Sequence, residues 1–286
     1  MKYSIHFYKG CNILEKADEI ILKYSEIHEA LPEYVKEYAD EQRIVIDIRK
    51  LEKDFLTEDE GKNLSIWVSA KENHRNFAIL LAETNIELLP VLQENNINYF
   101  FDTRVDTMDK LTNLVNLGVS DIYICNELGF SLKTIAPYCH NNKTNIRVYP
   151  NVAQSSSSRK GLNDFKKFFI RPEDVDFYEE YVDIFEFFTE DLSKQKVLYQ
   201  IYKDKKWLGD IRDLILELEY KEPILNYTII PDFALNRINC GKACGIGKCQ
   251  MCDRILSIAE LANRIKEESG HQLYIRRKNE EDKDKY

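Results

Sequence analysis

The sequence lacks the signatures of several large enzyme classes. It contains no GxSxG nucleophile elbow, no GxxxxGK[ST] phosphate loop and no HExxH metal helix. Histidine is scarce, and its five residues are spread along the chain, so the sequence gives no support to a histidine-based triad. These absences exclude the commonest motifs of serine hydrolases, P-loop nucleotide hydrolases and zinc metalloproteases.

Long hydrophobic runs and an excess of basic charge are also missing. The longest apolar runs, such as NFAILLA, are far shorter than the roughly 20 residues that cross a bilayer, so we expect no membrane span. The net charge of -9 disfavours direct binding of nucleic acid. The first residues, MKYSIHFYKG, do not resemble a secretory signal, so we expect a cytoplasmic protein with reduced cysteines. The sequence leaves open whether the chain binds a protein partner.

What the sequence does contain is a regular alternation of short β-rich runs and helical patterns up to about residue 205. Such alternation is typical of βα units and a mainly parallel sheet. The candidate strands are residues 2–8, 43–48, 76–82, 98–103, 121–125, 145–150, 167–170 and 183–188. Eight strands close a TIM-type (β/α)8 barrel, which we predict for residues 1–205, although an open doubly wound sheet would show the same alternation.

The rest of the chain is expected to differ from this barrel. Residues 206–275 are predicted to form a C-terminal cysteine-rich extension with a closing helix, and residues 276–286 a disordered tail. Two helix boundaries are also readable from the sequence. Gly118 is expected just past a helix that ends at Asn116 and Leu117, and Pro172 at the first position of another.

Polar residues recur where the predicted strands end. In a barrel the carboxyl ends of the strands share one mouth, so we expect Asp47, Arg49, Asp102 and Arg104 to lie at its rim, with structural salt bridges as the alternative for any single residue. Arginines there would bind an anionic or zwitterionic substrate, and carboxylates would do acid or base work. The predicted catalytic residues are Glu127, Arg171 and Glu186, and the predicted substrate-binding residues are Arg147, Asn151 and Gln154.

Four of the seven cysteines fall within thirteen residues, Cys240, Cys244, Cys249 and Cys252. Three of the ten glycines lie among them and would let the backbone turn sharply around a metal. We predict that the four sulfurs bind one metal centre, with reactive or buried thiols as the alternative. Cys11, soon after the first strand, is an alternative fourth ligand.

The spacing leaves the metal open. The gaps between the four cysteines are three, four and two residues, whereas ordinary zinc sites separate two Cys pairs by roughly a dozen residues or more. Crowded cysteines favour an iron-sulfur cluster, and a single zinc knuckle is the alternative.

The middle of the chain resembles a known family. The segments LGVSDIYICNELGFSLKTIAPYC, NIRVYPNVAQ and FFIRPEDVDFYEEYVDIFEFF are similar to the collagenase-like peptidase family of unassigned catalytic type. This resemblance implies a TIM-type barrel and places Glu127, Arg171 and Glu186 in the family's strand-end motifs. Members of the family are associated with peptidase activity, or with oxygen-independent hydroxylation that uses a cysteine-bound iron-sulfur cluster. The His-Gly that commonly follows the last strand of the family is absent after Glu186.

Three functional hypotheses follow from these observations. The first is a barrel protein of this family that binds an iron-sulfur cluster and acts in a redox or hydroxylation step. The second is a peptidase-like hydrolase of small molecules or peptides with a structural zinc knuckle. The third is a non-enzymatic, zinc-stabilised binding protein.

Overall fold

The computed structural model describes residues 1–7, 17–27, 30–37, 41–51, 60–124, 131–151, 170–187, 193–210, 213–214 and 238–239. The chain divides into two compact units. The first comprises residues 1–125, 136–148 and 182–186, and the second comprises residues 126–135, 149–181 and 187–286.

The first unit contains a nine-stranded sheet in which all paired strands are parallel. The strands are β1 (Lys2–His6), β2 (Glu19–Lys23), β3 (Arg43–Asp47), β4 (Phe77–Leu81), β5 (Asn98–Phe101), β6 (Arg104–Val105), β7 (Asp121–Ile124), β8 (Asn145–Val148) and β9 (Ile184–Glu186). Their order in the sheet is β5-β4-β3-β2-β1-β9-β8-β7-β6. Only Asp102 and Thr103 separate β5 from β6, so the two ends of this order are joined by the chain itself.

Side-chain contacts show how strongly this sheet curls. Arg43 of β3 forms an ion pair with Asp121 of β7, with 2.5 Å between Nη2 and Oδ2. These strands are five positions apart in the order, which in a flat sheet would separate them by roughly 24 Å. The sheet therefore curls until side chains from distant strands meet on its concave face, which is a TIM-barrel-like arrangement.

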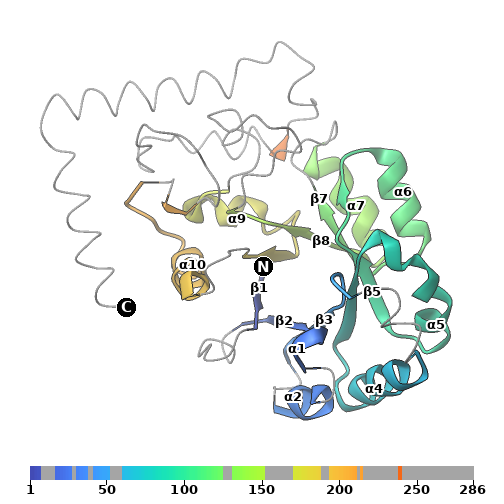
Figure 1. The fold of residues 1–286 in the computed structure, drawn as a ribbon. Helices are drawn as coiled ribbons and strands as arrows, with labels where there is room; N and C mark the ends of the chain where they lie inside the picture. The colour runs from blue at the N-terminus through green and yellow to red at the C-terminus, as the bar shows by residue number, and fades with distance from the viewer. Residues whose placement is uncertain are drawn as a thin grey trace, which may run out of the picture. The chain divides into compact units, whose positions relative to one another are not determined.

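Helices follow most of the strands of the first unit and lie on the outer side of the curl (Figure 1). They are α1 (Tyr24–Ile27), α2 (Leu31–Glu37), α4 (Glu60–Asn73), the 3₁₀ helix η2 (Glu83–Leu88), α5 (Leu89–Glu94), α6 (Met108–Asn116) and α7 (Leu132–Asn141), the last of which begins in residues of the second unit.

Helix α6 shows why these segments are helical. Thr107 caps its N-terminus by accepting a hydrogen bond from the backbone N–H of Lys110 at 3.3 Å. Leu111, Leu114 and Val115 recur at helical spacing and are buried. Gly118 follows the helix with a φ of +77°, a conformation that glycine adopts without strain, so the predicted helix end is confirmed.

Comparison with the sequence-based expectations confirms an α/β, TIM-barrel-like fold and corrects the set of strands. Six predicted strands correspond to β1, β3, β4, β5, β7 and β8, and the eighth corresponds to β9. Strand β2 (EIILK) is missing from the prediction, because it runs directly into α1 without a turn signal.

The strand predicted at residues 167–170 has no place in the observed sheet. Strand β8 pairs directly with β9, through Arg147 with Ile184 and Val148 with Phe185, so no strand lies between them. Ile170 is not in a strand, and residues 167–169 lie outside the described residues.

The described part of the second unit includes η3 (Pro172–Asp174), α9 (Val175–Tyr178) and α10 (Ser193–Lys203). Pro172 stands at the start of η3, as the sequence predicts. The buried Tyr202 of α10 donates a hydrogen bond to the carbonyl of Ile170 at 2.7 Å and packs against the ring of Phe187. The predicted cysteine-rich extension lies almost wholly outside the described residues.

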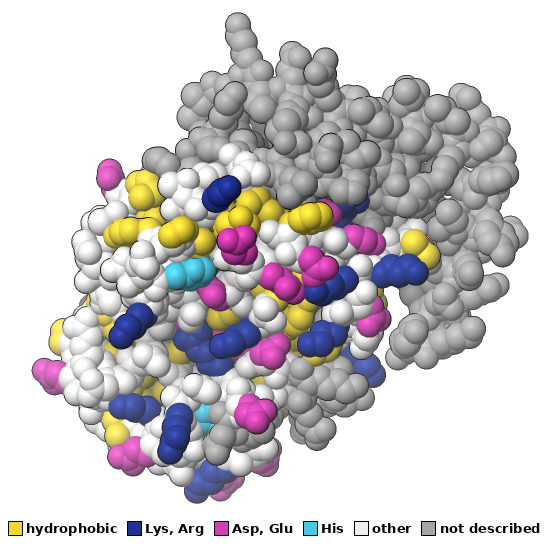
Figure 2. All heavy atoms as spheres, turned by 180° about the vertical axis from the view of Figure 1, so that it is seen from behind, with side chains coloured by type: hydrophobic (Ala, Val, Ile, Leu, Met, Phe, Trp, Pro, Cys, Tyr) yellow, Lys and Arg dark blue, Asp and Glu magenta, His cyan; other side chains and the backbone are white. Residues whose placement is uncertain are grey.

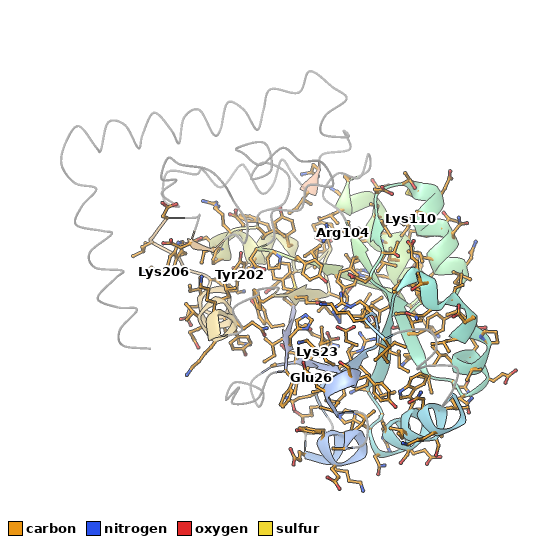
Figure 3. The ribbon with its side chains drawn as sticks, viewed as in Figure 1. Lys23, Glu26, Arg104, Lys110, Tyr202 and Lys206 are labelled. Carbon is orange, nitrogen blue, oxygen red and sulfur yellow. The ribbon has the colours of Figure 1, made fainter. Side chains whose placement is uncertain are left out.

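The surface carries mixed charge. On the face drawn in Figure 2, acidic and basic side chains alternate over the described surface, and no broad basic patch is visible there. Figure 3 shows one such pair at the junction of β2 and α1, where Lys23 Nζ lies 3.0 Å from Glu26 Oε1.

Candidate active site on the concave face of the sheet

The concave face of the sheet is lined with charged side chains. Because alternate residues of a strand share one face, Arg43 and Asp47 point to the same side of β3. Asp102 lies just beyond the end of β5, two residues after Phe100, so the same alternation places both side chains on one face. The Phe100 ring lies beneath two guanidinium groups, with its centroid 4.6 Å from Arg147 Cζ and 5.6 Å from Arg43 Cζ.

These charged groups form two sets. The start cluster consists of Glu19, Arg43 and Asp121, which are the first residues of β2, β3 and β7. The end cluster lies at or just beyond the carboxyl ends of β1, β3, β5 and β9 and consists of His6, Asp47, Arg49, Asp102 and Glu186.

The start cluster contains a bidentate ion pair between Arg43 and Asp121. Arg43 donates from Nη1 to Asp121 Oδ1 at 2.6 Å and from Nη2 to Asp121 Oδ2 at 2.5 Å. Asp121 also accepts hydrogen bonds from Ser120 at 2.6 Å and from Asn145 at 3.2 Å. Burial alone would raise the pKa of Asp121, but the charges of Arg43 and Arg147 outweigh it and lower the pKa to about 2. Asp121 is therefore held as a carboxylate.

Arg147 of β8 connects the two clusters. Its side chain has no exposed surface, and it donates from Nη2 to Glu19 and from Nη1 to Glu186 Oε2, the latter at 2.7 Å. Its Nε lies 3.5 Å from Asp121 Oδ1. Burial opposes the charged form, but the surrounding carboxylates raise the pKa of Arg147. Arg147 therefore stays a cation and fixes carboxylates from three other strands.

Glu186 ends β9, and three side chains contact its carboxylate. Its Oε2 accepts from Arg147 and from the Tyr123 hydroxyl, both at 2.7 Å, and its Oε1 lies 3.0 Å from His6 Nε2. Burial alone would raise the pKa of Glu186, but the His6 hydrogen bond and the Arg147 charge outweigh it and lower the pKa well below its ordinary range. Glu186 is thus a fixed carboxylate that orients the His6 ring.

Arg49 bridges two aspartates in the same cluster. It donates from Nε and Nη2 to the two oxygens of Asp47, at 2.8 Å and 2.7 Å, and from Nη1 to Asp102 Oδ2 at 2.7 Å. The Asp102 side chain is 36% exposed, whereas that of Asp47 is 7% exposed. Burial raises the pKa of Asp102 despite the neighbouring Arg49, and the charge of Glu186 adds to the rise.

The structure brings together only part of the predicted site. Arg147 and Glu186 form the ion pair described above. Asn151 and Arg171 are buried residues of the second unit, and Arg171 forms an ion pair there with Asp174. The remaining predicted residues, Glu127, Gln154, Cys240, Cys244, Cys249 and Cys252, lie outside the described residues, as does Cys11.

The sequence reasoning missed the start cluster, His6 and Tyr123. A signal for the start cluster was present, since Glu19, Arg43 and Asp121 each open a run of apolar residues, as in RIVID and DIYI. A charged first residue of a strand buried on both faces needs a partner inside the fold. His6 has no comparable signal, because its neighbours in the chain do not reveal that β1 pairs with β9.

The described residues contain no group of three or more His, Cys, Asp or Glu side chains that could hold a metal ion. None of the helices found in these ranges is long and apolar enough to pass through a bilayer. Comparison with protein-family models and with curated proteins gave no match.

Proposed function

We propose that this chain is a (β/α)8-barrel enzyme whose active site lies at the carboxyl ends of the strands. The short break between β5 and β6 supports a closed ring, because β5 and β6 then count as one interrupted strand and eight strands remain. TIM-barrel enzymes carry out their chemistry at this end of the barrel. The charged residues of the end cluster lie there.

The proposed chemistry is proton transfer by His6. The observation that carries it is the hydrogen bond between Glu186 Oε1 and His6 Nε2, in which a buried and otherwise saturated carboxylate holds the imidazole ring. A histidine that is oriented in this way by a carboxylate is a common general acid or base. Glu186 itself is fully buried, so its part would be to position His6 rather than to touch the substrate.

A substrate screen with matched variants tests this role. The panel contains peptides, esters and small carboxylic acids, and turnover is compared between wild type, His6→Gln and Lys110→Gln. Gln can still hydrogen-bond to Glu186 but cannot transfer a proton, so we expect a loss of kcat of about 10²-fold or more with little change in KM. Lys110, which lies 3.8 Å from Glu83 and outside the end cluster, is the control and should retain full activity. Unchanged turnover in His6→Gln would contradict the proposal.

We propose also that Cys240, Cys244, Cys249 and Cys252 bind one metal centre, with an iron-sulfur cluster favoured over zinc. Their spacing and the resemblance to the collagenase-like peptidase family support this, and with a cluster the reaction class would be a redox or oxygen-independent hydroxylation step. With zinc the alternatives are a peptidase-like hydrolase or a binding protein.

Metal analysis of protein purified without oxygen distinguishes these possibilities. An iron-sulfur cluster gives visible absorption together with iron and sulfide, whereas zinc gives a colourless protein. Each single Cys→Ser change should remove most of the metal. Full metal content in all four single variants would contradict the site, and loss in three of them together with Cys11→Ser would identify Cys11 as the fourth ligand.

A further inference from the structure

Arg49 differs from the other arginines of the concave face in how its partners are held. One edge of its guanidinium, Nε and Nη2, is bound by both oxygens of Asp47. The same carboxylate accepts the backbone N–H of Arg49 at 3.1 Å. Asp47 is the last residue of β3 and is buried, so this edge and the plane of the guanidinium are fixed.

The third contact of this guanidinium differs, because its partner is not part of a strand. Nη1 donates to Asp102, one of the two residues between β5 and β6. The Asp102 side chain is 36% exposed, against 16% for Arg49, so solvent reaches the pair from the Asp102 side. An anion from solvent that takes the place of the Asp102 carboxylate would therefore lie against the Nη1 atom.

We propose that Arg49 is the anion-binding residue of this site, and that a carboxylate of the ligand takes the place of the Asp102 carboxylate against Arg49 Nη1. This rests on the proposed function only in placing the substrate at the end cluster. It names the substrate class as a molecule with a carboxylate group, bound beside His6 and Glu186.

The charge balance of the cluster favours a singly charged anion. At present two carboxylates, Asp47 and Asp102, face one guanidinium. Exchange of the Asp102 carboxylate for that of a ligand keeps this balance, whereas a phosphate dianion would add negative charge near Asp47 and Glu186. A carboxylate also matches the geometry of a guanidinium edge.

Release of Asp102 is also made easier by its surroundings. Burial and the charge of Glu186 disfavour its ionised form, which raises its pKa. Arg104, the first residue of β6, also attracts the Asp102 carboxylate electrostatically, so a second guanidinium lies within range of the released group. The partly exposed side chain of Asp102, its hydrogen bond to a single guanidinium and the nearby Arg104 make its exchange for a ligand carboxylate less costly.

Acetate titration of the full-length protein tests this exchange without any assay of turnover. Binding is followed by NMR shifts of the arginine side chains at constant ionic strength, with chloride as the balancing anion. We expect weak acetate binding to wild type, about tenfold tighter binding to Asp102→Asn, and loss of binding in Arg49→Gln. Lys110→Gln should match wild type.

Misfolding cannot explain the gain of affinity expected for Asp102→Asn, because an unfolded variant does not bind acetate more tightly than wild type. Arg49→Lys is the second variant because it keeps a cation at this position. It should bind acetate at least tenfold more weakly than wild type, since it cannot keep both the Asp47 fork and an anion. Equal acetate binding in wild type, Asp102→Asn and Arg49→Gln would overturn the proposal. Tighter binding of inorganic phosphate than of acetate to Asp102→Asn would overturn the carboxylate class. Retained turnover in His6→Gln would remove the proton-transfer role alone and leave this result standing.

Discussion

The start cluster and the end cluster use the same chemistry with opposite results. In each, an arginine donates hydrogen bonds to aspartates on the concave face of the sheet. Asp121 in the start cluster has its pKa lowered to about 2, whereas Asp102 in the end cluster has its pKa raised. Asp121 is fully buried among four donors that favour its charge, while Asp102 has one strong donor and a neighbouring carboxylate.

This difference separates a structural role from a functional one. The carboxylates of the start cluster, Glu19 and Asp121, are buried and paired with arginine, so we expect this cluster to hold the curled sheet together. The end cluster keeps a half-exposed carboxylate in an unfavourable setting, and perturbed groups of this kind gather at functional sites. The predictions below test whether the two clusters differ in this way.

The largest effect is expected from Arg147→Met, because Arg147 contacts carboxylates of both clusters. The change removes the buried cation that bridges Glu19 and Glu186, and such a loss costs about 3–5 kcal/mol of unfolding free energy. Urea unfolding can be followed through Trp67 in a Trp207→Phe background, since the chain has two tryptophans and Trp67 belongs to the first unit.

The matched control for Arg147→Met is Lys23→Met, which also lies in the first unit. Lys23 Nζ lies 3.0 Å from Glu26 Oε1, but the Lys23 side chain is 43% exposed. Exposed pairs of this kind contribute about 1 kcal/mol or less. Equal losses in the two variants would show that burial of Arg147 does not matter to its role.

A smaller effect is expected from acid, and it comes from Asp121. Its pKa lies below the ordinary value of 3.8. Its contribution to stability is therefore complete above that value and is lost as the pH falls through about 2. We expect the difference in unfolding free energy between wild type and Asp121→Asn to shrink by about 2 kcal/mol between about pH 5 and about pH 2. A difference that stays constant over this range would show that the carboxylate charge is not what stabilises the start cluster.

The smallest effect is expected from Tyr123→Phe, which removes one hydrogen bond to Glu186 and keeps the ring beneath Arg147. A buried hydrogen bond to a charged group contributes about 1.5 kcal/mol or more. Tyr24→Phe is the comparison, because the Tyr24 hydroxyl donates at the same 2.7 Å to an uncharged amide oxygen, that of Asn63, in the same unit. We expect a loss of about 1 kcal/mol of unfolding free energy there, followed through Trp67. A larger loss in Tyr24→Phe than in Tyr123→Phe would contradict the importance of the Glu186 charge.

Much of the fold could be predicted from the sequence, because buried parallel strands appear as short apolar runs such as FAILL and DIYI. Strand β2 could not, since no turn residue separates EIILK from the helix that follows. The expected count of eight included a strand at 167–170 between the sixth and eighth strands, whereas β8 pairs directly with β9. It also left out β2, so the count agreed with a barrel although the set of strands differed.

The candidate site was predicted less completely, for a physical reason. Strand ends can be read from sequence, and this gave Asp47, Arg49, Asp102, Arg147 and Glu186. Contacts across the curl cannot be read from sequence, because Arg43 meets Asp121 only when the four strands between β3 and β7 curl around. The bond between His6 and Glu186 joins residues 180 positions apart in the chain, and nothing near either residue announces the other.

The most direct test of the contrast between the clusters is the unfolding free energy of Asp121→Asn and Asp102→Asn at pH 7, measured side by side through Trp67. Both changes replace a carboxylate that faces an arginine with an amide of the same shape. We predict a loss of at least about 2 kcal/mol for Asp121→Asn and a change within about 0.5 kcal/mol, or a gain in stability, for Asp102→Asn. Equal losses in the two variants would contradict the separation of a structural start cluster from a functional end cluster.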